Sequence, residues 1–273
     1  DHVTPNVKLL SLAFLLIFFS FDGIQQYVTT YFDEAGVRQV GFTSLLIIYI
    51  AFALVNPVAA VVVSKVGAKR SMLGAVSFYA LYCFSLLSAS APLIYAASVL
   101  LGVAGAVLWT AQNSYLIRAS DSAVYGANAG FFSTLFAIGA ASGVFLLGLL
   151  LPSWGYKIGF ILFAVVPLIA LAPLLLLQDI RAEAKKSQWQ EMRRAMVSIT
   201  ALRIAGVWFA FNFIQGLMVG IIPLQIKSTI GVWAIGILGG MFYIMPMLFA
   251  YVFGKFSDLR GRRGMITLMY ALS

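Results

Sequence analysis

One acidic side chain interrupts a long apolar stretch near the start of the chain. Asp22 is the only charged residue between positions 9 and 32. A charge at the centre of a membrane helix costs about 2.5–3.5 kcal/mol on insertion scales, so such a residue usually faces a cavity and has a partner. Gln25 and Gln26 follow at i+3 and i+4, on the same helix face. We expect Asp22 to contact substrate or to carry a coupling proton. The alternative is an uncharged or hydrogen-bonded carboxyl that only packs helices.

A second polar stripe lies in a later apolar stretch. Trp109, Gln112 and Asn113 are spaced i, i+3 and i+4, so they share one face of a helix. We interpret this stripe as the lining of a cavity. The alternative is hydrogen bonding between helices, worth about 0.6 kcal/mol per bond. Asn212 and Gln215, in a third apolar stretch, are expected to form the facing wall.

A basic loop separates two apolar stretches near the C-terminus. Its spacing is G-x-x-x-D-x-x-G-R-R, formed by Gly254, Asp258, Gly261, Arg262 and Arg263. Such a tight loop needs glycine at its bends and an anion to organise its arginines at a membrane surface. The alternative is a basic loop that only follows the charge bias of membrane proteins.

An earlier loop is a degenerate copy of this one. It contains Gly67, Lys69 and Arg70, but Ser64 occupies the position of Asp258. An ion pair made by the aspartate is therefore available only in the later copy.

Apolar helices must position all these residues. Hydrophobic residues make up 62% of the chain and charged residues 10%, against about 45–50% and about 25% in soluble domains. Long charge-free runs can cross a membrane only as helices or closed barrels, and the ten-residue alternation of a barrel does not occur. We predict eight complete helices at 8–32, 41–63, 71–88, 92–117, 127–150, 156–177, 203–226 and 231–254. A ninth begins near 264 and is too short to span, so we expect the protein to continue beyond Ser273.

Composition also excludes several functions. The chain has one cysteine, Cys83, and one histidine, His2. No intramolecular disulfide is available, and a His/Cys metal site or a nucleophile–base pair cannot be assembled. We therefore expect no enzyme, no metal and no cofactor. Outside the apolar stretches, the sequence contains no combined basic and aromatic patch of the kind that would indicate nucleic-acid binding.

The distribution of positive charge predicts the orientation. If the N-terminus is cytoplasmic, only Arg38, Lys157 and Lys227 fall in outer loops, which leaves 15 of the 18 Lys and Arg residues inside. Cytoplasmic loops are enriched in Lys and Arg. We expect a multi-pass protein of the plasma or inner membrane, with a basic rim that contacts anionic lipid head groups.

Two local matches suggest an internal repeat. Residues 21–25 resemble residues 211–215 at an offset of 190, and the pair Tyr49-Ile50 matches Tyr243-Ile244 at an offset of 194. A charged linker from Gln178 to about Ala201 separates the two copies. Within the first copy, Gly139 and Gly143 form a GxxxG pair, which is expected to let two helices approach closely.

The loop spacing at 254–263 is the signature of the major facilitator superfamily, which the chain resembles. The resemblance implies an all-α polytopic fold, with a six-helix half over 1–177, a cytoplasmic linker over 178–202 and two to three helices of a second half over 203–273. The substrate site would lie between the halves near the midplane. By the same resemblance, Asp258 would pair with an arginine or a helix N-terminus and latch the cytoplasmic side.

The segment Gly102–Leu116 resembles the unc-ninety-three-like branch of the superfamily, as do Phe18-Phe19 and the stretch from Leu45 to Tyr49. Members include proposed transporters, trafficking chaperones and channel-regulating subunits. The first hypothesis is a secondary active transporter of a small solute that works by alternating access, with Asp22 as a substrate contact or a proton-coupling carboxylate. The alternative is a non-transporting partner of another membrane protein. The degenerate first loop, and Ser98 at the position of an arginine common in proton-coupled members, favour that alternative.

Overall fold

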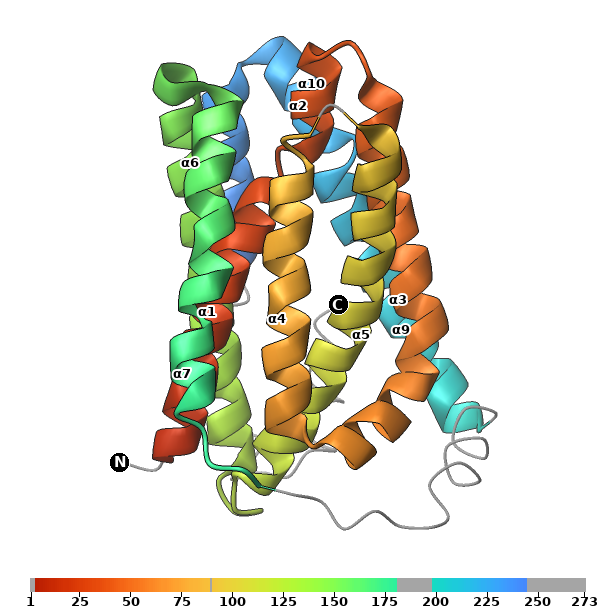
Figure 1. Ribbon diagram of the computed structural model, residues 1–273, viewed down its shortest axis with the longest axis vertical. Helices are drawn as coiled ribbons and strands as arrows, with labels where there is room; N and C mark the ends of the chain where they lie inside the picture. The colour runs from red at the N-terminus through yellow and green to blue at the C-terminus, as the bar shows by residue number, and fades with distance from the viewer. Residues whose placement is uncertain (1–2, 89, 181–197, 245–273) are drawn as a thin grey trace.

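The chain folds into an upright bundle of helices (Figure 1). The computed structural model describes residues 3–88, 90–180 and 198–244, so the loop at 254–263 lies outside the described residues. We call the end that holds the N-terminus the lower end and the opposite end the upper end. Residues 3–180 are the first segment, and residues 198–244 are the second segment.

The first segment supplies most of the bundle. Its helices are α1 (Pro5–Gln25), α2 (Val28–Glu34), α3 (Arg38–Val66), α4 (Ala68–Ser85), α5 (Ala91–Arg118), α6 (Tyr125–Ile169) and α7 (Leu171–Leu175). α6 is two antiparallel helices joined at Gly155, where φ is 72° and ψ is 166°. Glycine is suited to this left-handed backbone, and the reversal falls between the expected spans 127–150 and 156–177.

Long apolar helices confirm the predicted fold class. Four helical stretches in the described part of the chain are long and apolar enough to cross a membrane: Pro5–Glu34, Arg38–Val66, Ala91–Arg118 and Tyr125–Leu175. The last of these crosses twice because it reverses at Gly155 (Figure 1). α4 and α9 run alongside these stretches, so the bundle is the all-α polytopic arrangement that the sequence predicts.

The second segment consists of α9 (Ile199–Val219), α10 (Ile222–Thr229) and a helix over Val232–Ile244. Its boundaries follow those of α1, α2 and α3 at an offset of about 194. For example, α2 begins at Val28 and α10 begins at Ile222. The sequence predicts an offset of 190 for the first helices of the repeat. This value is four residues, or about one helix turn, smaller than the offset of 194 that the helix boundaries give.

Two predicted helices are interrupted near their upper ends. The expected helix 8–32 breaks at Gln26 and Tyr27, and the expected helix 203–226 breaks at Gly220 and Ile221. The Tyr27 N–H donates to the Ile24 carbonyl at 2.9 Å in place of an i−4 bond. The Tyr27 hydroxyl donates to the Val144 carbonyl of α6 at 3.0 Å. This tertiary contact holds the break, and no local sequence signal predicts it.

Two glycines let α1 lie directly against α6. A Cβ atom at Gly139 would clash with the Leu15 carbonyl oxygen, and one at Gly143 would clash with the Phe19 carbonyl oxygen. Both carbonyls belong to α1, so the GxxxG pair provides the close helix approach that the sequence predicts. This contact fixes the position of the α1 face that carries Asp22.

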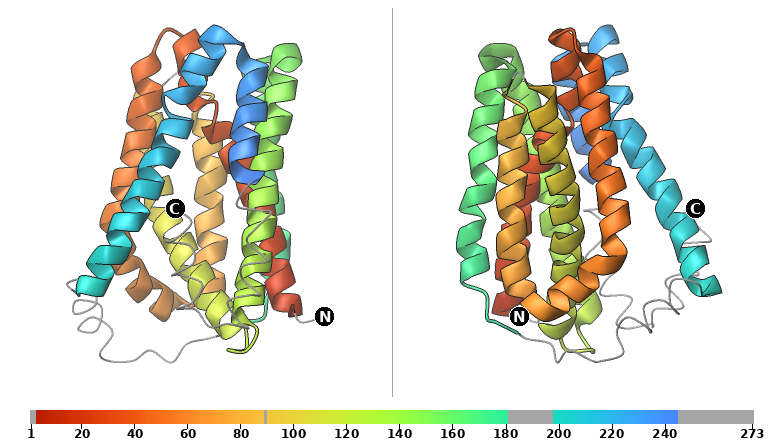
Figure 2. Two further views of the ribbon diagram at one scale, coloured as in Figure 1. Left: turned by 180° about the vertical axis from the view of Figure 1, so that it is seen from behind. Right: turned by 45° about the vertical axis from the view of Figure 1, so that its right-hand side comes forward.

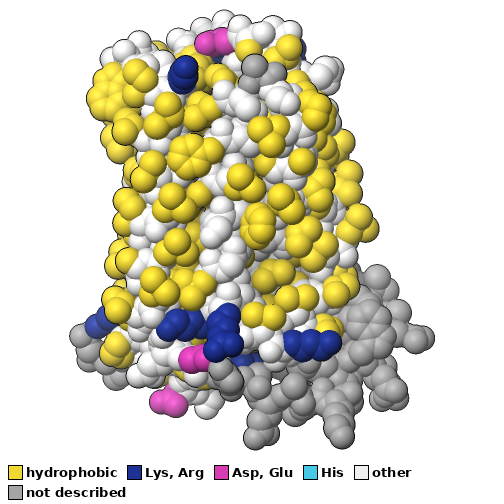
Figure 3. Space-filling model, in the orientation of Figure 1, with side chains coloured by type: hydrophobic (Ala, Val, Ile, Leu, Met, Phe, Trp, Pro, Cys, Tyr) yellow, Lys and Arg dark blue, Asp and Glu magenta, His cyan; other side chains and the backbone are white. Residues whose placement is uncertain are grey.

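Charged side chains gather at the two ends of the molecule, and apolar side chains cover the face between them (Figure 3). The lower ends of the helices carry Lys8, Lys65, Lys69, Arg70 and Arg118. Lys69, in the degenerate loop, donates to the carbonyls of Leu175 and Leu177 at 2.7 Å each. It therefore caps the C-terminal end of α7, while Gly67 supplies the left-handed turn between α3 and α4 with φ of 92°.

Candidate functional site

The Asp22 carboxyl is buried inside the bundle. Asp22 is 4% exposed, and its Oδ2 atom has no hydrogen-bond partner in the described part of the chain. A buried polar atom of this kind is uncommon and calls for an explanation.

Two tyrosines of the first segment lie within about one helix turn of Asp22. The Tyr79 ring of α4 packs against Phe18 at 5.9 Å and against Phe21 at 5.0 Å, and both phenylalanines precede Asp22 on α1. Tyr49 of α3 accepts a hydrogen bond from Gln25, which lies one turn above Asp22.

Tyr243 is the repeat partner of Tyr49 at the offset of 194. It packs with Ala140, Ala141 and Val144 of α6. Gln215 of α9 is half-buried, and its role in the site stays a prediction. No sequence motif marked Tyr79, and the repeat alone singled out Tyr49 and Tyr243.

The predicted stripe on α5 is not gathered at one point. Trp109 packs against Phe14, Phe18 and Phe136 at centroid distances of 5.2–5.5 Å. Phe18 also contacts Tyr79 at 5.9 Å. Trp109 therefore lies about one turn of α1 below Asp22 in a stack of rings. Gln112 is buried, whereas Asn113 is exposed, and so is Asn212 of α9.

Gln26 lies at the seam between the two segments and not in an open cavity. Its side-chain amide donates to the Met218 carbonyl of α9 at 2.8 Å. The Thr29 hydroxyl donates to the Gly220 carbonyl at 3.0 Å. The break after α9 leaves carbonyls without partners inside the helix, and these two side chains satisfy them. Gln26 and Thr29 are both buried.

Glycines seal the same seam against α6. A Cβ atom at Gly148 would lie 2.8 Å from the Gly236 Cα atom, and one at Gly236 would lie 3.2 Å from the Gly148 Cα atom. One helix turn lower, a Cβ atom at Gly239 would lie 3.0 Å from Val144. The upper part of the helix Val232–Ile244 therefore packs on α6 with little free space.

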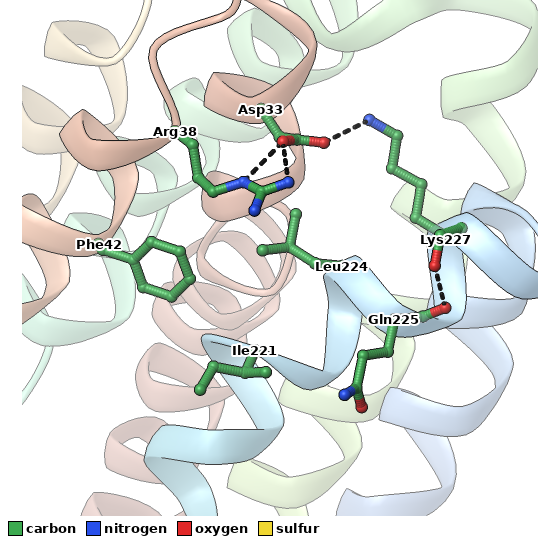
Figure 4. Close-up of a pocket in the computed structure, with 8 residues that line it drawn as sticks. Asp33, Arg38, Phe42, Ile221, Leu224, Gln225 and Lys227 are labelled. Atoms are coloured by element: carbon green, nitrogen blue, oxygen red, sulfur yellow. Dashed lines mark hydrogen bonds and ion pairs between the residues drawn. The ribbon is translucent and has the colours of Figure 1, made fainter.

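Ion pairs join the segments at the upper end. Lys227 of α10 lies 3.0 Å from Glu34 and 3.6 Å from Asp33, both on α2. Figure 4 shows Asp33 between Arg38 and Lys227, and its distance to Arg38 is 2.7 Å. Asp33, Arg38 and Lys227 border a crevice of about 520 Å³. The crevice is also lined by Phe42, Ile221, Leu224, Gln225 and Ser228.

α9 diverges from α3 on its way to Ile199, as the right-hand view of Figure 2 shows. The hydrogen bonds and ion pairs described between the segments, made by Gln26, Thr29 and Lys227, lie above Asp22. Lower down, Tyr243 packs with Ala140, Ala141 and Val144 of α6. The described seam is thus closed above Asp22, and α9 leaves α3 below it.

These features define a multi-pass helical membrane protein built from two segments around a buried carboxyl. The chain belongs to the Major Facilitator Superfamily, whose family model matches residues 9–273. The resemblance that the sequence indicates is confirmed.

Relatives extend the comparison to the unc-93 group. The UNC93-like protein MFSD11 of Xenopus tropicalis is 33% identical over 133 residues, which cover 48% of this chain and 30% of the relative. The UNC93-like protein 3 of Arabidopsis thaliana is 31% identical over 119 residues, or 44% of this chain and 25% of the relative. Protein unc-93 homolog A of Homo sapiens is 27% identical over 175 residues, or 61% and 36%. The chain spans about a third of the length of these relatives.

Proposed function

We propose that this chain is part of a secondary transporter that moves a small solute by alternating access. The observation that carries the proposal is the placement of Asp22, a buried carboxyl with an unpartnered oxygen, below a closed seam between two segments. A site between two halves, reached from one side at a time, is the arrangement that alternating access requires. Asp22, Gln25 and Gln215 are the proposed contacts, and Gln26 belongs to the seam.

The lower end is proposed to face the cytoplasm. The lower rim carries Lys8, Lys65, Lys69, Arg70 and Arg118, and cytoplasmic loops are enriched in such residues. In that orientation the structure corresponds to a state closed toward the outside. The two halves predicted from the sequence, residues 1–177 and 203–273, would then be the two rocking units, and the linker 178–202 would join them.

A cross-link at the upper end tests the proposal. Asp33→Cys and Lys227→Cys, in a Cys83→Ala background, place one thiol on each segment where an ion pair now joins them. The full chain in liposomes is screened for flux of neutral, anionic and cationic solutes, with and without a pH gradient. A short bifunctional thiol-reactive reagent, whose cross-link can later be reduced, should lower flux by more than about tenfold. The reason is that the upper end can no longer open.

Reduction of the cross-link should restore the flux, and each single-cysteine variant should be insensitive to the reagent. Flux that continues through fully cross-linked protein would contradict alternating access. Absence of any flux, together with stable co-purification of another membrane protein, would favour the regulatory partner.

A further inference from the structure

The transport proposal leaves the crevice at the upper end unused. Its volume of about 520 Å³ falls within the range of about 300–1,000 Å³ that is usual for small-molecule sites. The crevice lies where α2 and α3 of the first segment meet α10 of the second, and Asp22 does not line it (Figure 4). It is therefore a separate place for a ligand, and its chemistry can be derived from its own lining.

Both segments build the apolar walls of the crevice. Phe42 of α3 supplies one wall, and Ile221 and Leu224 of the second segment supply the other. A Cβ atom at Gly220 would lie 3.7 Å from the Phe42 ring. The Thr29 hydroxyl holds the same point, because it donates to the Gly220 carbonyl at 3.0 Å. The crevice thus has this shape only while the two segments are closed together at the upper end.

Arg38 is the polar group of the crevice that has donors to spare. A guanidinium carries five N–H groups. The Arg38 Nε donates to the Asp33 Oδ1 atom at 2.8 Å, and Nη2 lies 2.7 Å from the same oxygen. Figure 4 shows the third nitrogen, Nη1, turned away from Asp33. Because the side chain is 57% exposed, this free edge is open to a second carboxylate, which an arginine edge binds through two parallel hydrogen bonds.

The acidic side chains near the crevice offer no comparable place to a cation. Asp33 already lies between Arg38 and Lys227, at 2.7 Å and 3.6 Å. Glu34 lies 3.0 Å from Lys227. A cationic ligand would have to displace one of these basic side chains, whereas an anion adds to the free edge of Arg38. The crevice therefore favours an anionic head group on an apolar body.

We propose that the crevice binds a monocarboxylate with an apolar chain, and that its carboxylate lies on the free edge of Arg38. The chain lies against Phe42, Ile221 and Leu224. Because the chain touches both segments, the ligand binds the state closed at the upper end more tightly than the open state and raises its population. The crevice is then a regulatory site whose ligand differs from the transported solute. This regulatory part rests on the proposed function.

Equilibrium binding of hexanoate to the full chain tests the proposal without any need for flux. The protein is placed in phosphatidylcholine nanodiscs, and empty nanodiscs give the background of radiolabelled hexanoate. Binding should be saturable. Hexanamide, which has the same shape without the charge, and hexylammonium should each compete at least tenfold more weakly than unlabelled hexanoate. Equal competition by hexanamide would contradict the role of the carboxylate.

Variants of Arg38 separate its free edge from its ion pair. Arg38→Gln should weaken hexanoate binding about tenfold or more, and Arg38→Lys should lie between the two, because an ammonium keeps the charge and lacks the fork. Asp33→Asn removes the same ion pair and leaves the guanidinium, so it should bind within about threefold of the parent. Arg118→Gln makes the matched change at the lower end and should have no effect. An equal loss in Asp33→Asn and Arg38→Gln would overturn the proposal.

The apolar wall and the coupling to closure have their own readouts. Phe42→Ala should weaken binding about threefold to tenfold, with a melting curve to check that the bundle is intact. Thr29→Cys, in a Cys83→Ala background, places a thiol in the closed seam. Saturating hexanoate should slow its reaction with a membrane-impermeant maleimide at least threefold, and Arg38→Gln should abolish the effect. An unchanged labelling rate would overturn the regulatory part.

The source of the carboxylate is a separate arm of the experiment. Displacement of hexanoate by oleate within the nanodisc would assign the site to a fatty acid of the membrane, and a lack of displacement would assign it to a carboxylate from solution. Failure of both to bind would overturn the proposal. Hexanoate binding that depends on Arg38, without flux of any solute, would support the crevice and contradict transport. Flux that the upper cross-link stops, without hexanoate or oleate binding, would do the reverse.

Discussion

Replacement of Asp22 by asparagine is expected to reduce solute uptake by the full chain in liposomes by about 100-fold or more. The substitution keeps the shape of the side chain and removes its negative charge. Removing one partner of a buried charge pair costs about 3–5 kcal/mol, and each 1.4 kcal/mol is a factor of ten. A solute or proton that depends on the carboxylate would therefore be lost from the site. The measurement is the initial rate of uptake, with and without a pH gradient.

Two controls isolate the charge at position 22. Asp121→Asn makes the same chemical change in an exposed turn at the lower end and should transport normally. Surface expression and the melting temperature of Asp22→Asn should be at least those of the parent, because the variant relieves the burial of a charge. Unchanged uptake in a well-folded Asp22→Asn protein would remove Asp22 from the mechanism.

Reversal of the charge of Lys227 is expected to open the upper end. In Lys227→Glu, the side chain that now pairs with Asp33 and Glu34 would repel them. Because the three side chains are 20–46% exposed, the gain from the ion pairs is modest. Loss of that gain together with the new repulsion should raise the population of the open state about tenfold, or about 1.4 kcal/mol.

Labelling of a buried seam residue measures this opening. Thr29→Cys, in a Cys83→Ala background, places a thiol where Thr29 is now fully buried against Gly220. A membrane-impermeant maleimide applied from the upper side should react about tenfold faster in the Lys227→Glu variant. Gln39→Cys, on the exposed upper surface, should react at the same rate in both backgrounds.

Charge complementation gives a direct check of the ion pair. Glu34→Lys combined with Lys227→Glu restores opposite charges and should return the labelling rate close to that of the parent. Lys157→Glu changes an exposed lysine near the upper end and should not alter the rate. If Lys157→Glu has the same effect as Lys227→Glu, a general change of surface charge and not the ion pair would control the opening.

Much of the fold could be predicted from local patterns. Charge-free runs gave the expected spans, and the reversal at Gly155 falls where a Pro and Gly pair separates two of them. The spacing of Gly139 and Gly143 also predicted a close approach of two helices, although it did not indicate that α1 is the partner helix. Each of these features depends on residues within one or two helix turns, which is the range over which sequence periodicity is informative.

The interruptions of α1 and α9 and the seam could not be predicted in this way. Its spacing to Asp22 predicts that Gln26 lines a cavity. Instead, its side-chain amide donates a hydrogen bond to the Met218 carbonyl, 192 residues away in the chain. The ion pair of Glu34 and Lys227 likewise joins two segments that are distant in the chain. Only tertiary packing brings these groups together, and no periodicity within one helix encodes them. The same holds for Trp109, which packs in a ring stack one turn below Asp22.

The central claim is that the two segments rock about the Asp22 level, and paired distance measurements test it most directly. Spin labels at Gln39 and Ser228 report on the upper end, and labels at Arg118 and Ile199 report on the lower end; all four positions are exposed. We predict that Lys227→Glu lengthens the upper distance and shortens the lower distance in the same population of molecules. Upper and lower distances that stay fixed, or that lengthen together, would contradict the account.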